Sequence, residues 1–165
     1  MKNLLLKLIP MLFLFTTVIS SQSNEIAQNS VHLELLGNGL LYSLNYERAL
    51  YKSLNARAGI GYYQVSEIGD GGDNVSLTTV PVMINYLLGS KSSKIEVGIG
   101  ACFVFASANF EEVASVSGST TLGTATFAYR YQRPEGGIMF RAGVTPFFGD
   151  IGFQLWFGIG FGYAF

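Results

Sequence analysis

The chain ends on Phe153-Gln154-Leu155-Trp156-Phe157-Gly158-Ile159-Gly160-Phe161-Gly162-Tyr163-Ala164-Phe165. Every second residue of this stretch is large and apolar, and most residues between them are small. Alternation with a period of two predicts a β-strand with one apolar face. That face is mostly aromatic and reaches the last residue. The end of the chain therefore favours an all-β protein whose final strand lies against an apolar medium.

The same alternation recurs along the rest of the chain, with turn signals between the segments. We predict eight strands, at about residues 29–37, 40–50, 54–63, 77–88, 94–105, 121–132, 137–148 and 153–165. Strands of roughly 9–14 residues can cross a bilayer when they are tilted. Pro81 lies inside the fourth strand and lacks an N–H, so a bulge or a local gap in pairing is expected there.

The predicted connections alternate between short and long. Short turns fall near residues 51–53, 89–92 and 133–136, and longer loops near 69–73 and 106–118. This alternation is typical of up-and-down bacterial barrels, which have an even number of strands. With eight strands, both ends of the mature chain lie at the short-turn end, which is the periplasmic one in such barrels.

The first two strands are separated by Asn38-Gly39, a strong hairpin signal. A two-residue turn there pairs Leu35 with Tyr42 and Leu33 with Leu44, so the apolar faces match. The alternative is one long strand with a bulge at residues 37–39, because a bulge also shifts the phase by one residue. That alternative leaves seven strands and moves the N-terminus to the opposite end.

Composition agrees with a membrane protein. The chain has 165 residues, of which 49% are hydrophobic and only 13% charged. An ordinary soluble domain has about 25% charged residues. The net charge of -1 gives no sign of nucleic-acid binding. Cys102 is the only cysteine, which excludes an internal disulfide.

The N-terminus has the features of an export signal. Lys2 and Lys7 are followed by the apolar run 8–19 and by small residues at Ser20-Ser21. We therefore expect a signal peptide at residues 1–21 and one mature domain at residues 22–165. The alternative is an uncleaved anchor, but the apolar run is shorter than the ~20 residues of a spanning helix.

The two faces of the predicted strands suit a membrane barrel. The face of glycine, alanine, threonine and arginine has too few charges for a solvated surface, but it suits the lumen. A soluble lipid-binding barrel would instead turn its apolar face inward. Tyrosines near strand ends fit the aromatic girdles of a bilayer interface. They are Tyr42, Tyr46, Tyr86, Tyr129 and Tyr163.

Three segments carry a resemblance to a known family. They are 35–48 (LLGNGLLYSLNYER), 140–146 (FRAGVTP) and 160–165 (GFGYAF). The chain resembles small outer-membrane β-barrel proteins of Bacteroidota, over nearly the whole mature sequence. The resemblance implies an eight-stranded barrel in the outer membrane. It implies no established activity and no catalytic residues.

Six charged side chains are predicted to face the lumen, namely Glu34, Glu47, Arg57, Glu96, Arg130 and Arg141. His32 and Gln154 are placed nearby. An eight-stranded barrel is just wide enough for its side chains to fill. We therefore interpret the three acids and three bases as a structural ion-pair network, since an unpaired buried charge is costly. The alternative is a polar conduit or a switchable plug.

Catalysis has weak support in the sequence. His32 is the only histidine, Glu34 shares its face, and Ser43 lies diagonally across the proposed hairpin. A lipid-modifying enzyme with such a triad is a third hypothesis, but we assign no catalytic, cofactor-binding or metal-binding residues. A lone histidine makes a poor metal site. Cys102 is interpreted as a small lumen filler.

The sequence thus predicts an exported, monomeric outer-membrane barrel with a filled lumen and external loops. Its expected contacts are outer-membrane lipid, the barrel-assembly machinery during insertion, and an extracellular partner that the sequence does not identify. The insertion and closure signal is assigned to Phe161, Tyr163 and Phe165 in the last strand. A narrow conduit for small or hydrophobic solutes, leaving sideways near Pro81, is the alternative function.

Overall fold

The computed structural model describes residues 27–66, 74–89, 91–109, 116–150 and 152–165. The predicted signal peptide and the loop near residues 69–73 lie outside these ranges. The strands are β1 (Asn29–Leu36), β2 (Tyr42–Tyr51), β3 (Leu54–Ser66), β4 (Asn74–Leu88), β5 (Ser93–Asn109), β6 (Val116–Gln132), β7 (Gly137–Val144), β8 (Phe147–Gly149), β9 (Gly152–Gln154) and β10 (Phe157–Ala164). None of the described residues forms a helix with the length and hydrophobicity needed to cross a membrane.

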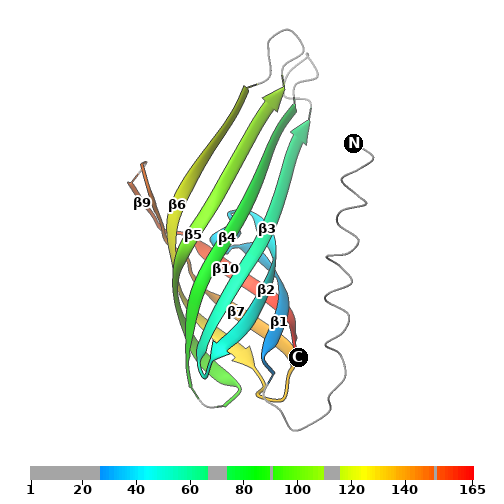
Figure 1. The fold of residues 1–165 in the computed structure, drawn as a ribbon, viewed down its shortest axis with the longest axis vertical. Helices are drawn as coiled ribbons and strands as arrows, with labels where there is room; N and C mark the ends of the chain where they lie inside the picture. Colours follow the sequence, from blue (N-terminus) through cyan, green and yellow to red (C-terminus); the bar gives the residue numbers. More distant parts are fainter. Residues whose placement is uncertain (1–26, 67–73, 90, 110–115, 151) are drawn as a thin grey trace.

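The strands close into an antiparallel barrel of eight strands, as predicted (Figure 1). The eight are β1–β7 and β10, and the barrel closes between β1 and β10, where Ser30 pairs with Ala164. Side chains alternate between the two faces of each strand. The pairing register of the strands therefore determines which side chains face the lumen.

The first hairpin has the predicted register but a different connection. Leu35 pairs with Tyr42 and Leu33 with Leu44, so the hairpin is confirmed and the single bulged strand is wrong. The connection is not a two-residue turn, however. Residues Gly37–Gly39 form one 3-10 turn, η2, and are fully buried inside the barrel. We call this segment the inserted turn.

The last two predicted strands are each broken. The prediction of one strand over 137–148 is wrong because β7 ends at Val144, just before Thr145 and Pro146. Pro146 has no N–H for a ladder, and its carbonyl accepts from Ala125 N–H at 3.1 Å. The predicted strand over 153–165 likewise breaks at residues 155–156, between β9 and β10. The β8–β9 hairpin then leaves the barrel wall, and β8 pairs with β6 at Gly123.

The strands β3–β6 are longer than predicted and rise above the rest of the barrel (Figure 1). β5 and β6 continue into the predicted loop at 106–118, where Ala106 pairs with Gly118. The prediction of a loop over all of 106–118 is therefore wrong at its two ends, where the strand pairing continues. We call residues 61–66, 74–79, 102–109 and 116–122 the projecting wall.

The ladder between β3 and β4 has a gap beside Pro81, as predicted. Ala58 pairs with Val82 and Gly61 with Thr79, whereas the two residues between them on each strand do not pair across this ladder. The register is the same on both sides of the gap, so no residue is inserted. On its other side, Pro81 pairs with Cys102 of β5.

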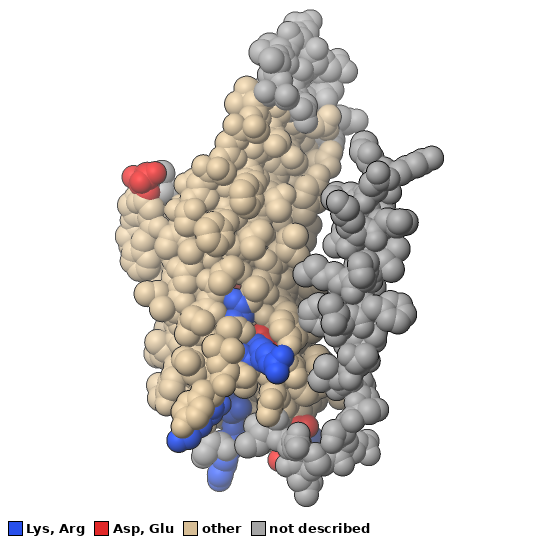
Figure 2. All heavy atoms as spheres, viewed as in Figure 1, with Lys and Arg blue, Asp and Glu red and all other residues tan. Residues whose placement is uncertain are grey.

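The outer surface of the barrel is apolar and the interior is polar. Side chains such as Leu44, Ile60, Ile99 and Phe161 are 54%, 56%, 71% and 56% exposed. The buried set is instead dominated by polar and charged residues. The space-filling view shows the same contrast, with a mostly uncharged wall and basic residues gathered near one end (Figure 2). This arrangement is the reverse of a soluble globular protein.

Candidate functional site

The most distinctive site is the charged cluster inside the barrel. Six side chains from six different strands lie there, each with at most 2% of its surface exposed, namely Glu34, Glu47, Arg57, Glu96, Arg130 and Arg141. Register places them together, because Glu47 pairs with Arg57 and Arg130 with Arg141 across neighbouring strands. Glycines opposite, such as Gly160 across from Arg141, leave room for the long side chains.

The acids and bases of the cluster form one connected set of ion pairs. Arg130 Nη1 lies 2.5 Å from Glu47 Oε1, and Arg141 Nη1 lies 2.7 Å from Glu34 Oε1. Arg57 Nη1 lies 3.7 Å from the same Glu34 oxygen. With three charges of each sign, the cluster is neutral as a whole.

Glu96 is the acid that contacts all three bases. Its carboxylate oxygens lie 2.9 Å from Arg141 Nη2, 3.4 Å from Arg130 Nη1 and 4.0 Å from Arg57 Nη1. Glu34 contacts two of the bases and Glu47 contacts one. Removing Glu96 would therefore take an ion-pair partner from all three bases, whereas removing Glu47 would take one from Arg130 alone.

The inserted turn is held above this cluster by Asn38. Its Nδ2 donates to Thr124 Oγ1 at 2.7 Å and to the Ala125 carbonyl at 3.2 Å. Its Oδ1 accepts from Arg57 Nη2 at 2.5 Å and from Thr126 Oγ1 at 2.9 Å. Asn38 thus ties the β1–β2 connection to β3 and β6 on the far wall. The sequence analysis missed this role, because Asn-Gly signals an exposed hairpin turn.

Two aromatic side chains complete the support of the inserted turn. Tyr63 Oη accepts the N–H groups of Leu41 at 3.0 Å and Tyr42 at 2.8 Å, and it donates to the Gly39 carbonyl. Trp156 Nε1 donates to the Leu40 carbonyl at 3.0 Å. Above the turn, the interior becomes apolar, with Cys102, Val104 and Phe147 buried together.

The residues considered for catalysis do not form a triad. His32 is buried, and neither of its ring nitrogens has a hydrogen-bond partner among the described residues. Ser43 Oγ accepts from Asn45 Nδ2 at 2.9 Å instead. Gln154 was placed near the lumen, but this is wrong: it is exposed on the β8–β9 hairpin, because the break before β10 carries β9 away from the barrel. Within the described ranges, no group of three or more His, Cys, Asp or Glu could hold a metal ion.

Solved structures with a similar fold are small bacterial barrels. The N-terminal β-barrel domain of Pseudomonas aeruginosa OprF superposes with a TM-score of 0.58 at 15% identity, covering 84% of this chain and 96% of that one. Ail, the attachment invasion locus protein of Yersinia pestis, in complex with the heparin analogue sucrose octasulfate, gives a TM-score of 0.53 at 12% identity, with 84% and 94% covered. The chain has the fold of the small outer-membrane β-barrels.

Comparison by sequence adds nothing to this likeness. No protein-family model matches the chain, and no curated protein matches it.

Proposed function

We propose that this protein is an exported outer-membrane barrel with a closed lumen that acts as a structural or interaction protein. The apolar outer surface supports the membrane location, since the bulky side chains of the wall would contact lipid tails. The short-turn end would face the periplasm and the projecting wall the outside. The proposal extends to a monomer of the Bacteroidota type named above, without enzymatic activity.

The proposal of a closed lumen rests on one observation: two layers block the interior, the six-charge cluster and the inserted turn above it. The six-charge cluster is buried, with at most 2% of each side chain exposed, and Asn38 above it is 0% exposed. A conducting barrel needs a polar path for ions, and a ring of one charge sign would favour ion selectivity. A neutral, paired cluster under an inserted turn supports a filled interior instead.

Planar-bilayer recordings test the closed lumen. The wild-type protein is expected to insert without steady channel events. Its folded state would be verified by faster migration of the unheated sample on a denaturing gel. As a control, the double variant Glu34→Ala/Arg141→Ala removes one acid and one base, so the cluster stays neutral but loses three ion pairs, and it should introduce detectable leak currents. Steady conductance by the folded wild type would refute the proposal.

The projecting wall supports an interaction role. Its outer face is mixed, with the exposed aromatic residues Tyr62, Phe103 and Phe105 beside the polar residues Gln64, Ser76, Thr78, Ser107, Ser117, Ser119 and Thr121. Its inner face is mostly apolar and carries Val65, Val75, Leu77, Val104, Ala106, Ala108, Val116 and Leu122, with Thr79 and Thr120 among them. In the described part of the chain, β3 beyond Ile60 pairs only with β4, and β6 before Gly123 pairs only with β5. Free edges beside an apolar face are sites where another chain can add.

A conduit for hydrophobic solutes is the second candidate, and the gap in the β3–β4 ladder favours it. Missing pairs beside Pro81 mark the weakest line of the wall, through which a solute could leave sideways. Uptake of a fluorescent fatty acid into vesicles containing the protein tests this function. Cross-linking β3 to β4 by Ala58→Cys/Val82→Cys should abolish uptake if the gap is the exit. Equal uptake by the oxidised and reduced variant would exclude this route.

The last strand is proposed as the signal for the barrel-assembly machinery. Phe161, Tyr163 and Phe165 lie on its lipid-facing side, and they are 56%, 59% and 44% exposed. Phe165 also exchanges two hydrogen bonds of 2.8 Å with Asn29. Deletion of Phe165 should therefore lower the amount of heat-modifiable protein in outer-membrane fractions. Unchanged assembly would argue against this role.

The enzyme hypothesis has its own test. A lipid-hydrolysing activity of the purified barrel that disappears on His32→Ala would revive it. We expect no such activity, because Ser43 and His32 make no hydrogen bond to each other in the described structure.

A further inference from the structure

Among the residues that the structure describes, all basic side chains outside the buried cluster lie at the short-turn end. They are Arg48, Lys52, Lys91, Lys94 and Arg133, four of them exposed and Lys94 half-buried. Only one acid, Glu135, accompanies them in the described structure. None of the five bases forms an ion pair with a described residue. This end therefore has a local excess of four positive charges in the part of the chain that the structure describes.

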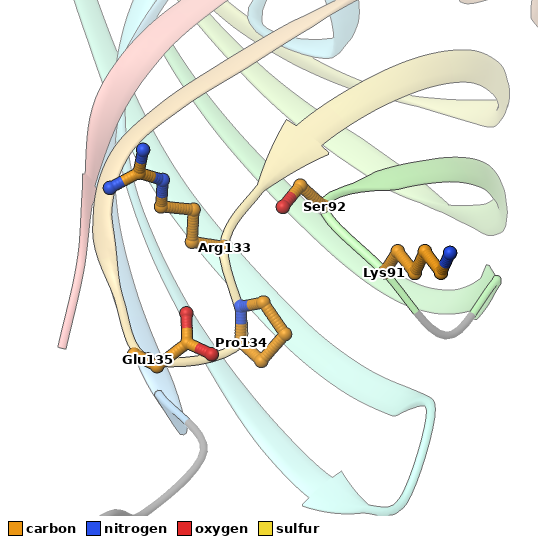
Figure 3. A pocket seen from close by; sticks show the side chains of 5 residues that line it. All are labelled: Lys91, Ser92, Arg133, Pro134 and Glu135. Atoms are coloured by element: carbon orange, nitrogen blue, oxygen red, sulfur yellow. The ribbon is translucent and has the colours of Figure 1, made fainter.

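Two of these bases lie on neighbouring turns. Gln132 N–H donates to the Ser92 carbonyl at 2.8 Å, which holds the β6–β7 turn against the β4–β5 turn. Lys91 and Arg133 line an open pocket of about 350 Å³ between them, with Ser92, Pro134 and Glu135. Figure 3 shows that the two cationic side chains point away from each other. The two side chains therefore do not converge on one small ion. The basic side chains as a group are distributed over this end of the barrel (Figure 2).

Exposed tyrosines surround the same end. Tyr51, Tyr86, Tyr129 and Tyr163 are 66%, 49%, 43% and 59% exposed, and all lie near the strand ends that meet the short turns. Tyr129 Oη lies 2.9 Å from Ser93 Oγ, at the start of β5. The Lys52 ammonium lies 5.1 Å from the Tyr51 ring centroid. Amphipathic rings of this kind mark the depth of lipid headgroups.

We infer that the short-turn end binds the phosphate headgroups of anionic phospholipids in the leaflet that it faces. Charge complementarity carries the inference: unpaired bases at headgroup depth attract a net negative headgroup and gain little from a zwitterionic one. The positive charge is spread over several turns. The surface can therefore contact several lipid headgroups at once, and it does not form a site for one free anion. The inference rests on the membrane location proposed above.

The experiment compares lipids retained by the protein. The full mature barrel is placed in nanodiscs of about seven parts dioleoylphosphatidylcholine to three parts dioleoylphosphatidylglycerol. Native mass spectrometry then gives the ratio of the two lipids that stay bound, relative to the disc. The wild type is expected to enrich phosphatidylglycerol about fivefold, which corresponds to roughly one well-placed base. Raising NaCl to about 0.5 M should reduce the enrichment, since surface charges are screened.

Variants at the turns assign the effect to this surface. The triple variant Lys52→Gln, Lys91→Gln, Arg133→Gln lowers the excess at this end from four positive side-chain charges to one, so it should lose most of the enrichment. The matched control Asp150→Asn changes one charge at the opposite end and should keep the wild-type enrichment. Faster gel migration of unheated samples verifies that each variant is folded. Because the three replaced side chains are exposed, we expect the triple variant to fold. If it does not fold, the double variant Lys91→Gln/Arg133→Gln replaces it in the experiment.

Three results would overturn the inference. They are equal retention of both lipids by the folded wild type, undiminished enrichment by the folded triple variant, and loss of enrichment when inorganic phosphate is added at constant ionic strength. The last result would mean that the surface recognises phosphate alone. Failure of the wild type to enter nanodiscs at all would instead refute the proposed membrane location.

Discussion

Glu96 shows how much a single side chain can determine inside a narrow barrel. Its carboxylate faces Arg141, Arg130 and Arg57 at 2.9, 3.4 and 4.0 Å. Glu96→Gln keeps the shape but leaves one buried positive charge without compensation, so we expect the free energy of unfolding to fall by about 3–5 kcal/mol. Urea unfolding in micelles, followed by the fluorescence of the single Trp156, measures the change.

The matched control for this variant is Glu135→Gln. Glu135 is exposed on the β6–β7 turn, so its replacement should change the free energy of unfolding by less than about 0.5 kcal/mol. Similar effects of the two variants would show that the buried cluster contributes no more than a surface charge.

The sequence predicts which face of a strand each side chain occupies. It does not predict the ion-pair and hydrogen-bond partners of an individual side chain. Strand alternation alone placed Glu34, Glu47 and Glu96 inside. It could not show that Glu96 contacts three arginines, because those contacts depend on the stagger of strands around the whole barrel. The hydrogen bonds of Asn38 to the far wall were likewise invisible, since they join residues 86 and 88 positions apart.

Among the elements, the inserted turn is held under backbone strain. Leu36 precedes it with φ of 57° and ψ of -136°, a region that favours glycine. Leu36→Gly should relieve this strain, whereas Leu35→Gly places glycine in a regular strand and weakens it. Both leucines are similarly exposed, at 44% and 49%. We expect the free energies of unfolding of the two variants to differ by about 2 kcal/mol, with Leu36→Gly the more stable.

The same urea titration in micelles measures this difference. Equal stabilities, or a more stable Leu35→Gly, would show that the conformation at Leu36 is not strained.

The predicted strand boundaries are wrong where a local sequence signal is compatible with two structures. Pro146 marks the end of β7, but proline also occurs at strand ends and edges, so the alternation was extended through it. Trp156 follows the alternation of the last strand, and its indole faces inward to the Leu40 carbonyl as that alternation predicts, but the break in the strand at residues 155–156 has no signal in the alternation. The upper ends of β5 and β6 fall in the predicted loop at 106–118, because their small and polar residues lack the strong apolar alternation of the barrel below.

At the scale of the whole molecule, the upper ends of β5 and β6 are separable from the barrel beneath them. The barrel interior is filled from the charged cluster up to the buried group of Cys102, Val104 and Phe147. Replacing residues 107–117 by Asn-Gly would join Ala106 to Gly118, which already pair, through a two-residue turn. We expect the shortened protein to keep its free energy of unfolding within about 1 kcal/mol, because the removed part lies above that core.

Unheated gel migration and urea unfolding check this expectation. A variant with residues 107–117 scrambled but not shortened controls for the change of sequence. A large loss of stability in the shortened protein alone would show that the wall and the barrel form one cooperative core.

The pairing of β1 with β10 has a consequence for biogenesis. Ser30 and Ala164 face each other across this seam, although they stand far apart in the sequence. The neighbours β3–β6, by contrast, are consecutive hairpins whose closure costs little chain entropy. The cylinder can thus be sealed only after β10 has been synthesised. Until then, β1 has one edge whose backbone groups lack a neighbouring strand.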